Sequence, residues 1–197
     1  AAAVFEHVKV DKYGIQFASF YLAGDFVPHV RLMHTGYQSP ELAKEFGMPF
    51  VLCREPTPID TTTLNYNWQV FETDAYSIYT RETDSIDDSS AKIAIDAVLR
   101  FLSAFNFIHC KTFGACQSEV IQEKDFISIV SPNGGLFRRL VNPGEEVRKG
   151  KPLALILDPL RGDVKNKIES PCDSLVFFSH KAPTVTEHQI CFFLQEK

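Results

Sequence analysis

The sequence lacks the cysteine motifs of a disulfide-stapled domain or of a zinc knuckle. Its five cysteines are odd in number and show no Cys-x-x-Cys spacing, so we expect reduced thiols in a cytoplasmic protein. No run approaches the roughly 18 apolar residues that a membrane helix needs, and lysine and arginine form no cluster. With a formal net charge of −5, these features argue against a membrane or nucleic-acid partner.

The remaining composition is that of an ordinary globular protein. The chain has 197 residues, of which 45% are hydrophobic and 23% are charged, enough for one large domain or two small ones. Phenylalanine is unusually frequent, at 17 residues. This abundance predicts cores filled by aromatic packing.

Strand and helix patterns alternate as far as about residue 108. Apolar residues recur at three- and four-residue spacing over 91–105, the strongest helix signal in the chain. The other expected elements are helices at 40–46 and 61–72, and extended segments at 14–22, 27–33, 49–53 and 75–80. This alternation predicts an α/β domain with a mostly parallel sheet over residues 1–110.

The sequence pattern changes beyond residue 110, where short predicted strands alternate with turn residues. Ser131-Pro132-Asn133 is echoed by Ser170-Pro171-Cys172, with Pro143-Gly144 between them. Regular turn signals without helical periodicity predict an all-β domain over 111–197. The pattern resembles the barrel-sandwich hybrid of lipoyl and biotinyl domains. The carrier lysine position holds Asp163, so a structural appendage is favoured over a swinging-arm carrier.

Two charged residues in the α/β region are candidates for chemistry. Glu82 follows a predicted buried strand, and a carboxylate at the end of a parallel strand projects into the crevice where such sheets bind ligands. It could act as a general base, or be a salt-bridged residue with Arg81 as its partner. Arg31 could bind a substrate carboxylate in bidentate fashion, or form an internal ion pair with Asp25 or Glu82.

The order of these parts resembles the C-terminal portion of the succinylglutamate desuccinylase/aspartoacylase family, which are zinc-dependent deacylases related to zinc carboxypeptidases. Three segments carry the resemblance: Thr80-Arg81-Glu82, the stretch 18–31, and the Pro-Gly-containing stretch 143–150. The resemblance implies a carboxypeptidase-like α/β domain and hydrolysis of the amide of an N-acyl amino acid or similar small acylated amine. It also implies that Glu82 is the catalytic base.

The sequence departs from this family at the metal site. None of the six histidines has a glutamate three residues later, and Phe17 stands where the family has its second histidine ligand. His29 and His34 are an odd number of residues apart, which places them on opposite faces of a strand. Zinc is therefore implied by the family but not expected to bind this chain alone, and we assign no metal ligand.

An alternative from another class is a non-catalytic relative of these enzymes that binds a small anionic ligand or a protein partner. That hypothesis predicts that Glu82 is paired with a positive charge. The partners expected from the sequence are a small acylated amino-acid-like substrate, and either a missing N-terminal half or a second copy of the chain.

Overall fold

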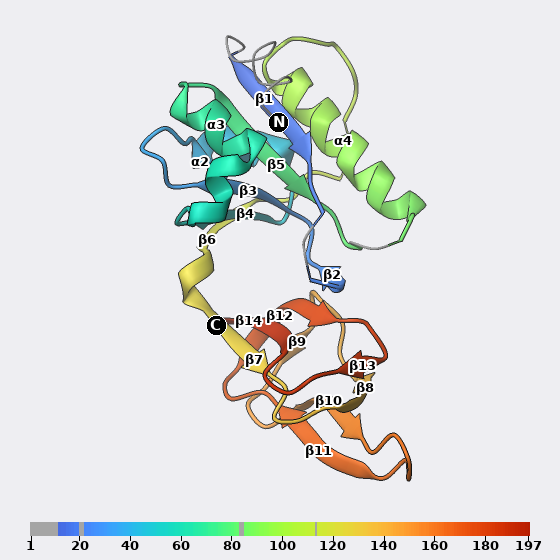
Figure 1. Cartoon of the computed structure of the whole chain (residues 1–197). Helices are drawn as coiled ribbons and strands as arrows, with labels where there is room; N and C mark the ends of the chain where they lie inside the picture. The colour runs from blue at the N-terminus through green and yellow to red at the C-terminus, as the bar shows by residue number, and fades with distance from the viewer. Residues whose placement is uncertain (1–11, 20–21, 83–84, 113) are drawn as a thin grey trace. The chain divides into compact units, whose positions relative to one another are not determined.

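The computed structural model describes residues 12–19, 22–82, 85–112 and 114–197, which form two compact units (Figure 1). The α/β unit comprises the described residues of 1–19, 28–80 and 87–124. The β unit comprises those of 20–27, 81–86 and 125–197. Two short segments from the N-terminal half of the chain thus belong to the β unit, so neither unit is a continuous stretch of sequence. The contiguous domain boundary expected near residue 110 stays a prediction.

The α/β unit is built on a five-stranded sheet of order β1-β5-β3-β4-β6. Its strands are β1 (Tyr13–Phe17), β3 (His29–Met33), β4 (Phe50–Arg54), β5 (Asp74–Tyr79) and β6 (Glu119–Gln122). Three neighbouring pairs are parallel, whereas β3 and β5 are antiparallel, so the sheet is mostly parallel as expected. The carboxyl ends of β1 and β5 consequently share an edge with the amino ends of β3 and β4.

Local sequence signals account for the helices. They are α2 (Pro40–Ala43), α3 (Leu64–Val70), α4 (Asp88–Ala104) and the 3-10 turns η1 (Lys44–Phe46) and η2 (Pro58–Thr62). Gly47 ends η1 with φ 59°, a left-handed conformation that favours glycine. The side chain of Asp87 accepts hydrogen bonds from the backbone of Ser89 and Ser90 and so caps α4. The helix expected over 61–72 is shorter, because Thr63 caps it and the preceding residues form η2.

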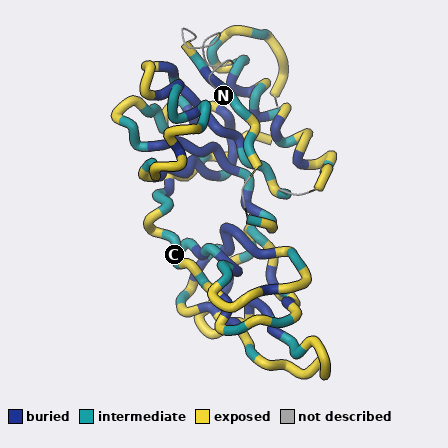
Figure 2. The backbone as a smooth tube through the Cα atoms, in the orientation of Figure 1, coloured by how far each residue is buried: buried dark blue, intermediate teal, exposed yellow. Residues whose placement is uncertain are grey.

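Helices cover both faces of this sheet (Figure 1). On one face, Phe101 of α4 stacks on Phe46 with ring centroids 4.4 Å apart, and Tyr76 of β5 packs beside them. On the other face, Trp68 of α3 lies so close to Gly14 that a Cβ there would be 2.5 Å from the indole. The predicted aromatic core is therefore present, and burial is concentrated in the strands (Figure 2).

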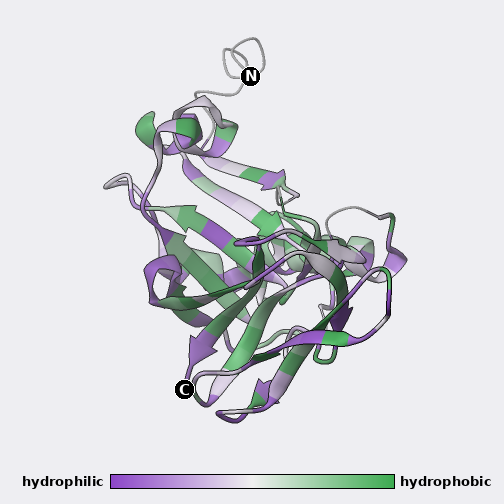
Figure 3. Ribbon diagram, turned by 60° about the horizontal axis from the view of Figure 1, so that its bottom comes forward, coloured by the Kyte–Doolittle hydropathy of each residue, from purple (hydrophilic) through white to green (hydrophobic). Residues whose placement is uncertain are grey.

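The β unit contains antiparallel strands in two sheets, one of order β11-β10-β8-β13 and one of order β2-β12-β14-β7, in which β9 also pairs with β12. Hydrophobic residues are concentrated in the strands (Figure 3). The strands are β2 (Gly24–Phe26), β7 (Phe126–Val130), β8 (Gly135–Arg139), β9 (Glu146–Val147), β10 (Pro152–Leu157), β11 (Val164–Glu169), β12 (Ser174–His180), β13 (Thr184–Val185) and β14 (Ile190–Glu196). A 3-10 turn, η3 (Glu123–Asp125), leads into β7.

The repeated Ser-Pro motifs adopt matching turns in the β unit. The hydroxyl of Ser131 donates to the carbonyl of Asn133 over 2.6 Å, and that of Ser170 donates to the carbonyl of Cys172 over 2.7 Å. Both serines are buried, so these bonds satisfy polar groups that would otherwise be costly. The sequence repeat thus corresponds to a structural repeat.

Among the described residues, no helix is long and apolar enough to cross a membrane.

Candidate functional site

Arg31 lies in the middle of β3 and is held by residues of the α/β unit. Its Nη2 is 2.9 Å from Oε1 of Glu123, and its Nη1 donates to the Tyr79 hydroxyl over 3.3 Å. The guanidinium also lies over the Tyr79 ring, 5.5 Å from its centroid. The alternative of an ion pair with Asp25 or Glu82 was wrong in its partner, because the carboxylate beside Arg31 comes from the turn after β6.

A second arginine reaches the same carboxylate. Nε of Arg54, at the end of β4, is 3.3 Å from Oε2 of Glu123. We call Arg31, Arg54 and Glu123 the arginine clamp. The arginines are buried, with side chains 6% and 10% exposed, whereas that of Glu123 is 36% exposed. Two guanidiniums from neighbouring parallel strands therefore bind one carboxylate that solvent can reach.

Asp60 supports the clamp from behind. Its Oδ2 lies 2.9 Å from Nη2 of Arg54 and accepts the backbone N–H of Thr57 over 2.7 Å. Burial acts to raise the pKa of Asp60, but hydrogen bonds from Thr57 and the Arg54 charge outweigh it, so the pKa lies below its ordinary value. Asp60 therefore stays ionised and holds Arg54 in place.

Polar residues extend from the clamp across the sheet. Arg31 faces Ser77 of β5 in the strand register, and Ser77 faces Gln16 of β1. Gln16 donates to the Ser77 hydroxyl over 2.8 Å. Two residues before Arg31 on β3, the buried ring of His29 stacks on that of Tyr79, with ring centroids 5.0 Å apart. Of this row, His29, Arg31 and Ser77 are buried. Buried polar side chains are unusual on the face of a sheet, and they mark this face as the candidate binding surface.

Glu82 has a different setting. It lies three residues beyond β5 and forms an isolated bridge with Asp25 in the β unit. Its Oε1 is 2.8 Å from Nζ of Lys181, and its Oε2 accepts a hydrogen bond from the Ser85 hydroxyl. Lys181, rather than the expected Arg81, therefore supplies its positive charge.

Asp25 and Arg139 complete a cluster of four charges around Glu82. Nη1 of Arg139 is 2.5 Å from Oδ2 of Asp25, and Nζ of Lys181 is 3.6 Å from Oδ1 of the same aspartate. The cluster holds two positive and two negative groups, all from the β unit. Glu82 and Arg31 thus belong to different compact units, each with partners of its own unit, and their expected catalytic and substrate-binding roles stay predictions.

The crevice at the carboxyl ends of β1 and β5 is apolar. A cavity of about 340 Å³ there is bounded by Phe17, Ile78 and Thr80 and by the first turns of α4. Phe17 ends β1, 64% exposed. α/β proteins place their ligands at the carboxyl ends of parallel strands. Here the side chain at the position of the family's second histidine ligand is that of Phe17, which cannot bind a metal.

The described residues do not fit a zinc ion. No three or more His, Cys, Asp or Glu side chains among them come together as a ligand set, whereas a catalytic zinc needs three. His29 stacks on Tyr79, and Nε2 of His34 lies 2.8 Å from the Gln122 side-chain oxygen.

Sequence reasoning missed Arg54 and Glu123. The available signal was a charged residue directly after the predicted apolar strand 49–53. Nothing local links it to Glu123, because that pairing depends on β6 joining β4 in the sheet.

The described chain thus combines an α/β unit with a unit of two antiparallel sheets. No family model and no curated protein matches the sequence. Solved structures do match. A succinylglutamate desuccinylase from Silicibacter sp. TM1040 has a TM-score of 0.80 at 14% identity, covering 98% of this chain and 61% of that one.

Two further structures agree. The product-bound ectoine utilization protein EutE (DoeB) from Ruegeria pomeroyi gives a TM-score of 0.81 at 16% identity, over 100% of this chain and 62% of that one. A succinylglutamate desuccinylase/aspartoacylase from Rhodobacter sphaeroides gives 0.76 at 16% identity, over 99% and 63%. The chain therefore has the fold of succinylglutamate desuccinylase/aspartoacylase proteins, which confirms the predicted resemblance at the level of fold. It spans 61–63% of the length of these structures.

Proposed function

We propose that the chain binds a small acylated amino-acid-like molecule through its carboxylate, and that Arg31 receives that carboxylate. The observation that carries this proposal is the arginine clamp, in which two buried guanidiniums already hold the Glu123 carboxylate. Paired N–H donors in a fixed fork suit carboxylates better than any other common anion except phosphate.

Exposure indicates which partner a ligand would replace. The arginines are fixed by burial, Tyr79 and Asp60, whereas Glu123 is the exposed member of the clamp. A ligand carboxylate can therefore take the place of the Glu123 side chain without moving either guanidinium. In this proposal, Glu123 is an internal competitor for the ligand.

Amide hydrolysis is the second candidate function, favoured by the likeness of nearly the whole chain to a succinylglutamate desuccinylase. In that proposal Glu82 is the general base, and it must first be released from Lys181. The described residues do not fit zinc, so we derive no step through a metal for this chain. A metal-binding half from outside these residues, or a second copy of the chain, would be its partner.

We further propose that residues 111–197 form a barrel-sandwich hybrid with a structural rather than a carrier role. The two antiparallel sheets and the matching Ser-Pro turns support the architecture. Lys165 lies on β11 with Nζ 3.6 Å from Oδ2 of Asp158, a surface ion pair and not a lysine presented at a hairpin tip. All five cysteines are free, which supports a cytoplasmic location.

Calorimetric titration with N-acetyl-glutamate tests the carboxylate proposal, with N-acetyl-glutamine amide as the matched ligand that lacks carboxylates. We expect Glu123→Gln to tighten binding about tenfold by removing the internal competitor, since charge-assisted hydrogen bonds contribute about 1.5–3 kcal/mol. Arg31→Lys should weaken it. Glu119→Gln, the same change at the exposed start of β6, is the control.

A purely structural role for the clamp predicts that Glu123→Gln leaves ligand binding as in Glu119→Gln, whatever its effect on stability. That result, or equal binding of the amide, would refute the proposal. Release of free amine from N-acyl amino acids by the full-length gene product tests the second candidate independently.

A further inference from the structure

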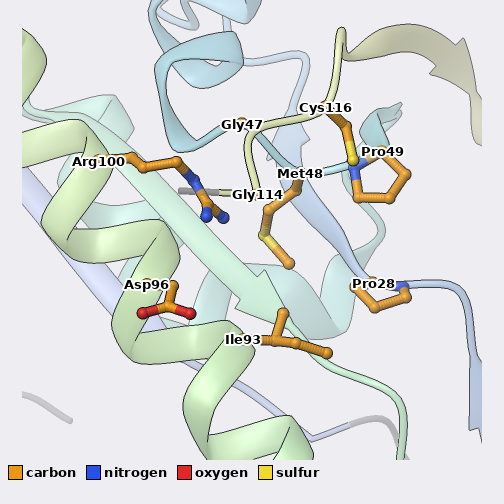
Figure 4. A pocket seen from close by; sticks show the side chains of 9 residues that line it. All are labelled: Pro28, Gly47, Met48, Pro49, Ile93, Asp96, Arg100, Gly114 and Cys116. Atoms are coloured by element: carbon orange, nitrogen blue, oxygen red, sulfur yellow. The ribbon is translucent and has the colours of Figure 1, made fainter. Parts of the chain in front are cut away.

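A second cavity lies on the other side of α4 from the apolar crevice. It measures about 240 Å³ and is bounded by the segments that lead into β3 and β4, by one face of α4, and by the segment 114–116 (Figure 4). We call it the α4 pocket. All its lining residues belong to the α/β unit, and neither Arg31 nor Glu82 is among them.

A buried guanidinium forms one wall of the α4 pocket. Arg100 is only 9% exposed, and its Nε donates to the Phe46 carbonyl over 2.7 Å. Figure 4 shows the guanidinium directed between Gly47 and Gly114. A Cβ at Gly47 would stand 2.8 Å from that Nε, so glycine is needed for this approach. The charge is therefore held at a fixed position in the wall.

A carboxylate lies one helical turn away. Asp96 and Arg100 are four residues apart on α4, a spacing that places them on the same face of the helix, and both line the pocket. Asp96 is half-buried and, within the described part of the chain, its side chain makes no ion pair or hydrogen bond. The pocket thus presents two opposite charges that do not neutralise each other directly.

The remaining wall is apolar. Met48, 1% exposed, and Ile93 of α4 face the cavity, together with the rings of Pro28 and Pro49. Figure 4 shows the Met48 and Ile93 side chains between the two charged groups and the prolines. A ligand with an aliphatic part would bury carbon against these side chains, at about 25 cal/mol per Å².

We infer that the α4 pocket binds a small zwitterion with an aliphatic side chain, that is, a free aliphatic amino acid. The ligand carboxylate pairs with Arg100, its ammonium pairs with Asp96, and its side chain packs on Met48 and Ile93. A ligand with a carboxylate but no ammonium would leave Asp96 without an ion pair in a partly desolvated site, and a ligand with an ammonium but no carboxylate would bring no negative group to the Arg100 guanidinium. The volume is below the roughly 300 Å³ at which drug-sized pockets begin, which excludes nucleotides.

Calorimetric titration of the purified chain with three probes tests the charge requirement. L-Leucine carries both charges, L-leucinamide lacks the carboxylate, and 4-methylpentanoate lacks the ammonium. We expect leucine to bind at least about tenfold more tightly than either analogue, since each analogue loses a charge-assisted pair. Equal affinities for all three probes would refute the inference.

Thiol footprinting locates the binding. Cys116 lines the pocket, whereas Cys110 is exposed but does not line it. Leucine should slow alkylation of Cys116 by iodoacetamide and leave Cys110 unchanged, as measured by peptide mass spectrometry. Equal protection of both thiols would place any binding elsewhere and overturn the assignment.

A pair of variants on one helix completes the test. Asp96→Asn should weaken leucine binding about tenfold, and Asp88→Asn, the same change of charge at the exposed start of α4, should not. Circular dichroism of both variants checks folding. No heat and no protection of Cys116 with millimolar leucine, or equal losses in the two variants, would overturn the inference.

Discussion

The carboxylates beside Arg54 should differ greatly in their contribution to stability, because one is buried and the other is reached by solvent. Replacing Asp60 with alanine removes the 2.9 Å contact to Arg54 and the acceptor of the Thr57 backbone N–H. Breaking a buried pair costs about 3–5 kcal/mol. Since Arg54 keeps Glu123 at 3.3 Å and the Glu55 carbonyl at 3.2 Å, we expect the lower end, about 3 kcal/mol.

Glu123→Ala should cost less, about 1 kcal/mol, because solvent already reaches the Glu123 carboxylate and weakens its attraction to the two guanidiniums. Glu41→Ala, which removes a pair on the surface of α2 with Lys44, should cost less than about 0.5 kcal/mol. The single tryptophan, Trp68, lies on α3, so its fluorescence during urea unfolding reports on the α/β unit. Equal losses for Asp60→Ala and Glu123→Ala would refute the reasoning that burial decides the contribution.

Three further predictions follow from single contacts. Hydrogen bonds from the side chain and backbone of Ser90 lower the pKa of Asp87 to about 2; this group therefore stabilises α4 above its unfolded pKa of about 3.9. Helix stability, followed by circular dichroism, should fall as the pH drops from about 4 to 2, and Asp87→Ala should lack that component. Burial raises the pKa of Cys191 to about 12, so iodoacetamide at mildly alkaline pH should spare it and label Cys110; labelling of both at one rate would contradict the burial. Gly14→Ala should cost about 1–3 kcal/mol by pressing on Trp68, unlike Gly134→Ala, where the nearest atom would be 3.4 Å away; matching urea midpoints would count against that close packing.

The parts of the fold that were predicted from the sequence depend on local chemistry. The helix at 91–105 corresponds to α4 because an apolar stripe, a capping aspartate and the absence of breakers act within one segment. Gly47 ended its helix for an equally local reason. The local sequence did not predict that β6 joins the sheet of the α/β unit, because Glu119–Gln122 has the same kind of sequence as the short strands that follow it.

The candidate site was harder to predict because its partners are distant in the chain. Arg31 and Glu123 are separated by 92 residues, and their contact depends on β6 pairing with β4. The Thr80-Arg81-Glu82 motif suggested a carboxylate at the end of a strand, but the strand ends at Tyr79 and Glu82 pairs with β-unit residues. The hydrophobic pattern of the sequence does not predict to which unit a residue such as Glu82 belongs once its strand has ended.

The two charged clusters differ in the exposure of their members in a way that bears on function. Around Glu82, the side chains of Asp25, Arg139 and Lys181 are 14%, 24% and 37% exposed and that of Glu82 is 27% exposed, so charges of both signs share the access to solvent. In the arginine clamp, both cations are buried and the anion alone is exposed. An incoming carboxylate can therefore displace Glu123 from rigid guanidiniums, whereas a ligand at the Glu82 cluster would have to rearrange cations and anions together. This asymmetry, more than the identity of the residues, favours the clamp as the ligand site.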